Sequence, residues 1–161
     1  MDNTLKQYRP GPLGALMDEY EKVAAEFDTV LLSISEADFV KLLDTETLDP
    51  SCVSVQAICA HVVRCGYNYA NYIRKQWHEP ITGNKKNFEF TSPQEVVAEM
   101  KLMLAYTEET LANKNHLTFQ DVLDNIIKSG WGQNFDLEQL LEHAIVHILR
   151  HRRQIEKLLG R

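Results

Sequence analysis

Residues 136–160 read DLEQLLEHAIVHILRHRRQIEKLLG, and this stretch decides the fold expected for the chain. Its leucines and isoleucines recur every three or four residues, which is the spacing of one face of an α-helix. Asp136 and Gln139 have the spacing of a capping box at its start, and Gly160 is a residue that commonly ends a helix. The stretch therefore predicts a long amphipathic helix over 136–160.

Three more stretches have the same helical spacing of apolar residues, with no sustained strand-like alternation to compete with it. They run over Pro12–Ile34, Ser54–Trp77 and Ser92–Ala112. The last opens with Ser-Pro-Gln-Glu, which offers a capping serine, a proline at the first helical position and a glutamate that reaches back. Shorter helical turns are expected at Ser35–Asp38 and Phe119–Ile127. Four long helices in 161 residues predict an all-α fold, an antiparallel four-helix bundle, as a single domain over 1–161.

The composition is that of a folded globular protein, with 44% hydrophobic residues, 25% charged residues, seven glycines and five prolines. Residues 1–14 lack the apolar segment of a signal peptide, and no stretch approaches the roughly 18 apolar residues of a membrane span. Three cysteines without CxxC spacing fit a reducing compartment and argue against a disulfide scaffold. We therefore expect a cytoplasmic protein without a membrane partner.

The charge balance argues against nucleic-acid binding. A net charge of −6 offers no basic surface to neutralise phosphates. A cluster of cations near the C-terminus is interpreted as charge that complements the dipole at the end of the last helix. It comprises Arg150, Arg152, Arg153, Lys157 and Arg161. Neither GxGxxG nor GxxxxGK[ST] occurs, so a dinucleotide or P-loop phosphate site has no support.

Half of the six histidines lie on one line of the last helix, at positions 143, 147 and 151. At about 100° per residue, setting His147 at zero places His151 at about +40° and His143 at about −40°. The apolar residues of this helix fall between about +20° and +120°. His151 should therefore lie inside the buried arc, His147 at its edge and His143 on the solvent side. The same construction places His61 at the margin of the apolar stripe of Ser54–Trp77.

His147 and His151 stand one above the other on the helix and can turn toward one point. A nitrogen from a facing helix would complete a three-histidine metal site with an open coordination position. Imidazole suits Zn, Ni, Fe or Cu, so the ligand type does not choose the metal. The alternative is that these histidines are hydrogen-bonded polar residues unrelated in space. The spacing leaves both interpretations open, because it cannot show that His61 converges with the other two.

The end of the last helix resembles a known signature. The run His147-x-x-x-His151-Arg152-Arg153-Gln154-Ile155 is similar to the HxxxHRGQ[IL] pattern of the DinB/YfiT-like superfamily. His61, within SVQAICAHVVRCGYNY, matches the position of that family's remaining ligand, and the likeness in length and helix order spans the whole chain. Arg153 replaces the signature's glycine. On the helical wheel with His147 at zero, Arg153 falls at about −120° and faces away from the proposed site, so metal ligation should be unaffected.

This resemblance implies an up-down four-helix bundle with a long crossover, which carries a divalent metal on three histidines and is often a homodimer. Carried onto this chain, the ligands are His61, His147 and His151, with Zn or Ni as the first choice and Fe or Mn as alternatives. Family members with known activity resemble transferases or isomerases that use a low-molecular-weight thiol, such as bacillithiol or mycothiol. The family name refers to induction after DNA damage.

The expected function is a metal-dependent thiol S-transferase or hydrolase-type enzyme, in which the ion activates a small thiol or water toward an electrophilic substrate. Two other functions remain open. One is a non-catalytic, stress-associated metal-binding protein with a closed coordination sphere, and the other is a helical interaction module without metal. No general acid or base stands out, so no catalytic residue is assigned.

Three features beside the expected site are assigned less direct roles. Cys65 follows His61 by one helical turn and is interpreted as a packing residue rather than a ligand. His143 is interpreted as facing solvent or as contacting the metal ligands, with metal ligation by His143 as the minor alternative. Residues 131–135, Trp-Gly-Gln-Asn-Phe, are interpreted as a loop anchored by its aromatic side chains, with a pocket rim as the alternative.

Overall fold

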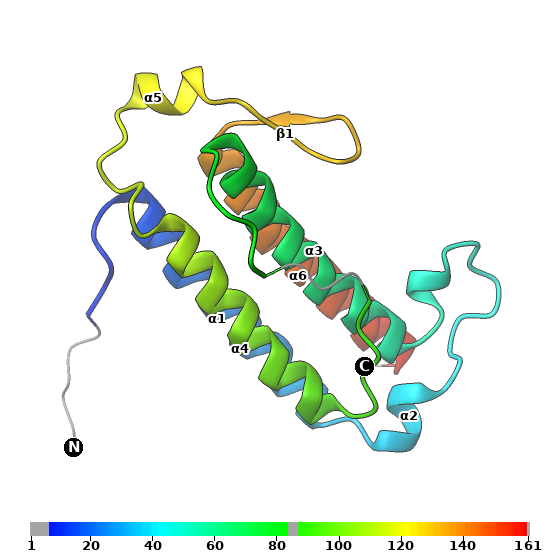
Figure 1. The fold of residues 1–161 in the computed structure, drawn as a ribbon. Coiled ribbons are helices and arrows are strands. Elements are labelled where there is room, and N and C mark those ends of the chain that lie inside the picture. The colour runs from blue at the N-terminus through cyan, green and yellow to red at the C-terminus, as the bar shows by residue number, and fades with distance from the viewer. Residues whose placement is uncertain (1–6, 84–86, 161) are drawn as a thin grey trace, which may run out of the picture.

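The computed structural model describes residues 7–83 and 87–160. Four long helices form a bundle, namely α1 (Gly11–Leu32), α3 (Val55–Gln76), α4 (Pro93–Leu111) and α6 (Leu137–Leu158). The connections contain α2 (Glu36–Val40), η1 (Pro50–Cys52), α5 (Phe119–Asp124), β1 (Ile127–Lys128) and β2 (Asn134–Phe135). The predicted all-α four-helix bundle is confirmed, and each long helix begins and ends within two residues of its expected range (Figure 1). In the described part of the chain, no helix combines the length and the apolar character that a membrane span requires.

The helix ends follow from the capping side chains. At the start of α6, Gln139 N donates to Asp136 Oδ1 at 2.8 Å and Asp136 N donates to Gln139 Oε1 at 3.1 Å, so the predicted capping box is present. At the start of α4, Glu95 N donates to Ser92 Oγ, whereas the Glu95 carboxylate accepts from Thr91 N at 2.7 Å, one residue before the cap. The helical turn expected over Phe119–Ile127 is shorter, because Asn125 leaves the helix after Asp124.

The four long helices surround the core in the order α1, α6, α3, α4, and α4 packs against α1 to close the ring. Figure 1 shows α1 and α6 running in one direction and α3 and α4 in the other. Contacts between α3 and α4 agree, because Tyr67 bonds to Glu99 and, further along both helices, Arg74 bonds to Thr110. These two consecutive helices are therefore parallel. The connection between Gln76 and Pro93 must return along the bundle, and it is the expected long crossover.

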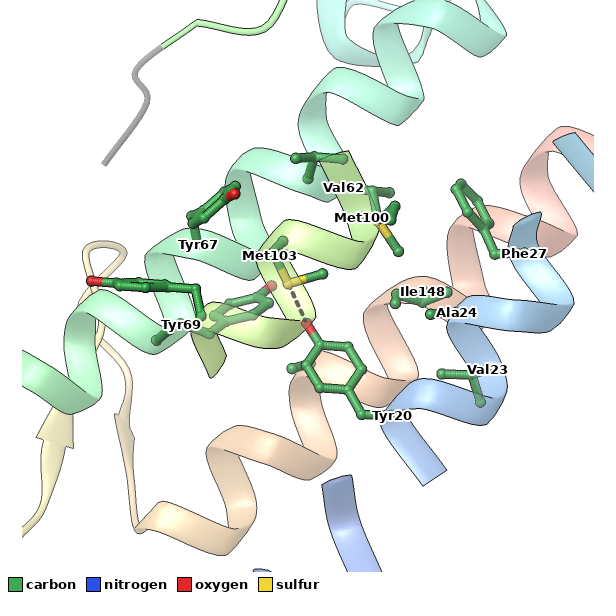
Figure 2. Close-up of a cluster of buried hydrophobic side chains, with 14 of the residues drawn as sticks. Tyr20, Val23, Ala24, Phe27, Val62, Tyr67, Tyr69, Met100, Met103 and Ile148 are labelled. Carbon is green, nitrogen blue, oxygen red and sulfur yellow. Dashed lines mark hydrogen bonds between the residues drawn. The ribbon is translucent and has the colours of Figure 1, made fainter. Parts of the chain in front are cut away.

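The interior is filled by aliphatic, aromatic and sulfur side chains from all four long helices (Figure 2). Tyr20 of α1 directs its hydroxyl at Met103 Sδ of α4, at 3.8 Å. Gly66 of α3 faces the same methionine, and a Cβ atom at this position would lie 2.5 Å from Met103 Sδ. The glycine thus permits the close approach of α3 to α4, since any side chain there would displace Met103.

Two buried cations join the end of α3 to the end of α4. Arg74 and Lys114 are only 5% and 2% exposed. Arg74 Nε donates to Thr110 Oγ1 at 2.6 Å, and its guanidinium lies 4.2 Å from the centre of the Tyr106 ring. Lys114 Nζ donates to Glu79 Oε1 at 2.6 Å and to Thr110 O at 2.8 Å. Because a buried charge is tolerated only when it is paired, these contacts hold the two helix ends together.

Candidate metal centre

Three histidines meet where α3 packs against α6. One ring nitrogen from each of His61, His147 and His151 lies within 4.8 Å of the other two. His61 Nε2 and His147 Nε2 are 3.1 Å apart, and the ring centres of His147 and His151 are 4.5 Å apart. Ligand nitrogens on one tetrahedral zinc ion with bonds of 2.0–2.1 Å would be roughly 3.3 Å apart. The sequence-predicted ligands are therefore brought together at a separation that suits a single cation.

The depth of each histidine follows from its position on its helix. His151 is 2% exposed, His147 is 8% exposed and His61 is half-buried. His147 and His151 project from the same face of α6 because they are one helical turn apart. The antiparallel neighbour α3 then presents His61 between them. The order of burial on α6 is the order expected from the helical wheel.

Gln154 orients His151. The Nδ1 atom of His151 lies 2.9 Å from Gln154 Oε1. An amide oxygen only accepts, so this contact puts the ring hydrogen on Nδ1 and leaves the Nε2 lone pair free. His151 Nε2 is buried and has no hydrogen-bond partner within residues 7–83 and 87–160. A buried, unpartnered nitrogen is costly, and a cation shared by the three imidazoles would be its missing partner. The residues present thus fit a divalent metal.

Burial keeps the three imidazoles neutral. It lowers the pKa of His147 to about 2 and that of His151 to about 4, because the imidazolium form is poorly solvated inside the bundle. The pKa of His61 is also lowered, first by burial and then by the charge of Arg64. Neutral imidazole is the form that coordinates metals, so the cluster could take up a cation at neutral pH without first losing protons.

A pocket of about 220 Å³ opens beside the histidine cluster. Its walls comprise His61, Cys65, Tyr69, Trp131, His143, Val146, His147 and Arg150. The Tyr69 ring lies against both His147 and Trp131, with ring centres 5.8 and 6.1 Å apart. Two of the three candidate ligands thus border a space that a small molecule can enter. Catalytic metal sites keep such an open side, whereas structural sites are closed by protein ligands.

The loop before α6 forms one wall of this pocket. It is a short hairpin in which Ile127 of β1 pairs with Phe135 of β2. Trp131, between the strands, packs against the rings of Tyr69 and His143 at 6.1 and 5.5 Å. The loop is therefore anchored by its aromatic residues, and it also forms the pocket rim. His143 belongs to this aromatic wall and not to the three convergent ligands.

Cys65 lies beside the cluster but outside it. Its Sγ atom is 3.7 Å from His61 Nε2, yet it is not among the atoms that converge. Its side chain is only partly buried, because one side faces the pocket. Burial raises the pKa of the thiol, which keeps it protonated at neutral pH. Cys52, Cys59 and Cys65 are all free.

The interpretation of the C-terminal cations as dipole-complementing charge is wrong for three of the four that the structure describes, because the helix dipole acts mainly within the last turn. Arg150 lies two turns before the end of α6 and lines the pocket, and Arg152 pairs with Glu26 of α1. Only Lys157 occupies the last turn. Arg153 is exposed, in agreement with a position facing away from the site, and Arg161 lies outside the described residues. Proximity to the C-terminus in sequence hid the position of Arg150 beside the cluster.

Fold and site together define a class of protein, an all-helical bundle in which three imidazoles converge between two helices. Metal sites in helix bundles are built in this way, from side chains on facing helices. The chain belongs to the DinB family, whose family model matches residues 1–160. The predicted resemblance to the DinB/YfiT-like superfamily is thereby confirmed.

A solved structure is similar to this chain, described as the crystal structure of the mycothiol-dependent maleylpyruvate isomerase. The TM-score is 0.50 at 12% sequence identity, and the match covers 94% of this chain. It covers 63% of the other chain, so this chain spans less than two thirds of that protein. At this identity the likeness supports the fold alone. No curated protein matches the chain.

Proposed function

We propose that this chain is a divalent-metal-dependent enzyme that combines a low-molecular-weight thiol with an electrophilic substrate. His61, His147 and His151 are the proposed ligands, and Zn or Ni is the first choice of metal, with Fe or Mn as alternatives. The observation that carries the proposal is the buried Nε2 atom of His151, held free of hydrogen by Gln154 and placed beside two more imidazoles and an open pocket. Membership of the DinB family, in which members with known activity resemble enzymes that use a low-molecular-weight thiol, is the ground for proposing a thiol as co-substrate.

The roles of the individual residues follow from their positions. A divalent cation, when bound, lowers the pKa of a coordinated thiol and makes it a nucleophile at neutral pH. His147 and His151 would hold the ion from α6 and His61 would hold it from α3, while Gln154 would keep His151 in the coordinating tautomer. Cys65 stays protonated and is not needed as the nucleophile.

The convergence of the histidines bears on the alternative functions. A helical interaction module without metal requires the three imidazoles to be unrelated in space, and they lie together. A non-catalytic metal-binding protein requires a closed coordination sphere, whereas a pocket borders His61 and His147. The pocket therefore favours the catalytic function. The homodimer, the cytoplasmic location and the absence of a nucleic-acid partner stay predictions.

The first test is the metal content of untagged protein purified without added metal, measured by elemental mass spectrometry. We expect near-stoichiometric metal in the wild type and its loss in His61→Ala, His147→Ala and His151→Ala. His143→Ala is the matched control, because it removes an imidazole of the same helix that is not in the convergent set. A wild type that stays empty after incubation with Zn or Ni refutes the proposal.

The metal-loaded protein is then assayed with bacillithiol, mycothiol or a simple thiol and a chromogenic aryl halide. If the wild type consumes the thiol and releases halide, and His61→Ala does not, the result would support the enzymatic function. Bound metal without turnover of any thiol would instead favour the non-catalytic metal-binding protein.

A further inference from the structure

Arg150, in the pocket wall, has no acidic partner among the residues that the structure describes. In residues 7–83 and 87–160, no carboxylate lies within ion-pairing distance of it. Three other arginines have acidic partners: Arg9 pairs with Asp18, Arg74 with Glu109 and Arg152 with Glu26. The chain has 23 acidic residues against 17 lysines and arginines, so acidic partners are abundant. An unpaired guanidinium in such a chain, at the wall of a pocket, is available to a ligand.

A second guanidinium adds to the positive charge near the pocket. Arg64 Nη2 lies 3.4 Å from His61 Nδ1, on the helix that faces Arg150. The charge of Arg150 acts on the whole histidine cluster, where it helps to lower the pKa of His61, His147 and His151. Low-dielectric walls strengthen such a field, so the pocket attracts anions.

The remaining walls define the shape of the ligand. Tyr69, Trp131 and His143 present ring surfaces whose centres are 5.5–6.1 Å apart. Aromatic walls favour a flat, apolar or unsaturated body. The volume of about 220 Å³ equals about seven water molecules at about 30 Å³ each, which limits the enclosed part of a ligand to roughly that many non-hydrogen atoms.

We propose that Arg150 binds the carboxylate of a small substrate whose flat, unsaturated body lies against Tyr69 and Trp131. A guanidinium presents a planar pair of donors that matches a carboxylate, and this pairing fixes the orientation of the bound molecule as well as its position. The body of the ligand would then lie next to His61 and His147. This inference rests on the proposed function, because it names the class of electrophile. The pairing with Arg150 does not itself require the metal.

Benzoate and its neutral isostere benzamide test the inference by isothermal titration of the chelator-treated protein and of the zinc-loaded protein. We expect benzoate to bind the wild type more tightly than benzamide, and Arg150→Gln to weaken benzoate binding about tenfold without changing benzamide binding. Arg150→Lys should retain part of the affinity. Arg153→Gln is the matched control, since it removes the same charge from the exposed face of α6 and should leave both affinities unchanged.

The site is located by Trp131 fluorescence in a Trp77→Phe background, because Trp131 lines the pocket and should respond to benzoate. Equal affinity for benzoate in the wild type and Arg150→Gln would overturn the inference, as would no detectable binding of benzoate to the wild type. Benzoate binding that needs zinc and ignores Arg150 would also overturn it while leaving the proposed metal site intact. Binding that depends on Arg150 in a protein that takes up no metal would uphold the carboxylate pocket and refute the proposed function.

Discussion

Acid should destabilise this bundle through two buried histidines. The pKa of His147 is about 2 and that of His151 about 4 in the folded chain, against an ordinary value near 6.5 for an unfolded chain. Below pH 6.5 the unfolded chain therefore binds more protons than the folded chain. By linkage, the free energy of unfolding falls as the pH drops. This stability is fully present above pH 6.5 and is lost as the pH falls toward the folded pKa values.

The size of the effect follows from the width of the pH interval. For each histidine, the free energy of unfolding falls by about 1.4 kcal/mol per pH unit below 6.5. Between pH 6.5 and pH 5 the loss is about 2 kcal/mol for each histidine, and up to about 4 kcal/mol for the two together. Both side chains are almost inaccessible to water, so solvent screening reduces this little. Asp28 acts in the opposite direction, because burial raises its pKa to about 6 and its contribution to stability grows as the pH falls below that value. A loss of 4 kcal/mol is large against the usual 5–15 kcal/mol of a folded domain.

Urea unfolding followed by circular dichroism, in a chelating buffer at pH 7 and pH 5, measures this loss. The control is the double variant His147→Gln and His151→Gln, which keeps polar side chains of similar size but cannot titrate. Asp28 and the surface carboxylates are common to both proteins, so the difference between them isolates the two histidines. If the wild type and the double variant lose the same stability between the two pH values, the two imidazoles are not buried in neutral form and the reasoning is wrong.

Three substitutions test other parts of the structure. Gln154→Leu removes the acceptor of the His151 Nδ1 hydrogen and should weaken metal binding about 10–100-fold in competition with a chelator. Unchanged affinity would contradict the orienting role. Gly66→Ala places a methyl group 2.5 Å from Met103 Sδ and should lower the free energy of unfolding in urea by about 1–3 kcal/mol. The loss should shrink in a Met103→Ala background, and an equal loss would argue against the steric clash. Glu79→Ala leaves the buried Lys114 ammonium without its carboxylate and should cost about 3 kcal/mol, measured in the same way. Adding Lys114→Met should recover most of that loss, and no recovery would show that the unpaired ammonium is not the cause of the loss.

The long helices could be predicted because each has an apolar stripe of helical period and side chains that cap its ends. The direction of α4 relative to α3 could not be predicted in this way, because an apolar stripe packs equally well against a parallel or an antiparallel neighbour. The connection from Gln76 to Pro93 is long enough either to turn back or to return along the bundle. The β1–β2 pair also escaped prediction, because strands of two residues carry no alternating pattern.

The candidate site was predictable in its parts but not in its assembly. The helical wheel ordered His151 and His147 by depth, because that order depends only on the buried arc of α6. The convergence of His61 depends on the antiparallel packing of α3 on α6, which spacing alone cannot supply. Gln154 appeared in the signature without a role, and only its contact with His151 Nδ1 explains its presence. Arg150 was misassigned because the pocket that it lines with other residues of α6 is completed by the hairpin loop and α3, whose packing beside it the sequence does not show.

The two halves of the histidine cluster are 86 residues apart in sequence, from His61 to His147. During synthesis at about 5–20 residues per second, His61 leaves the ribosome several seconds before the histidines of α6. Helices α1, α3 and α4 already contact one another through α4, so much of the core can form while only one ligand is present. A cation cannot be held by all three imidazoles until the last helix docks. The order of synthesis would thus make metal uptake by the proposed site a late event, because the unfinished chain lacks two of the three proposed ligands.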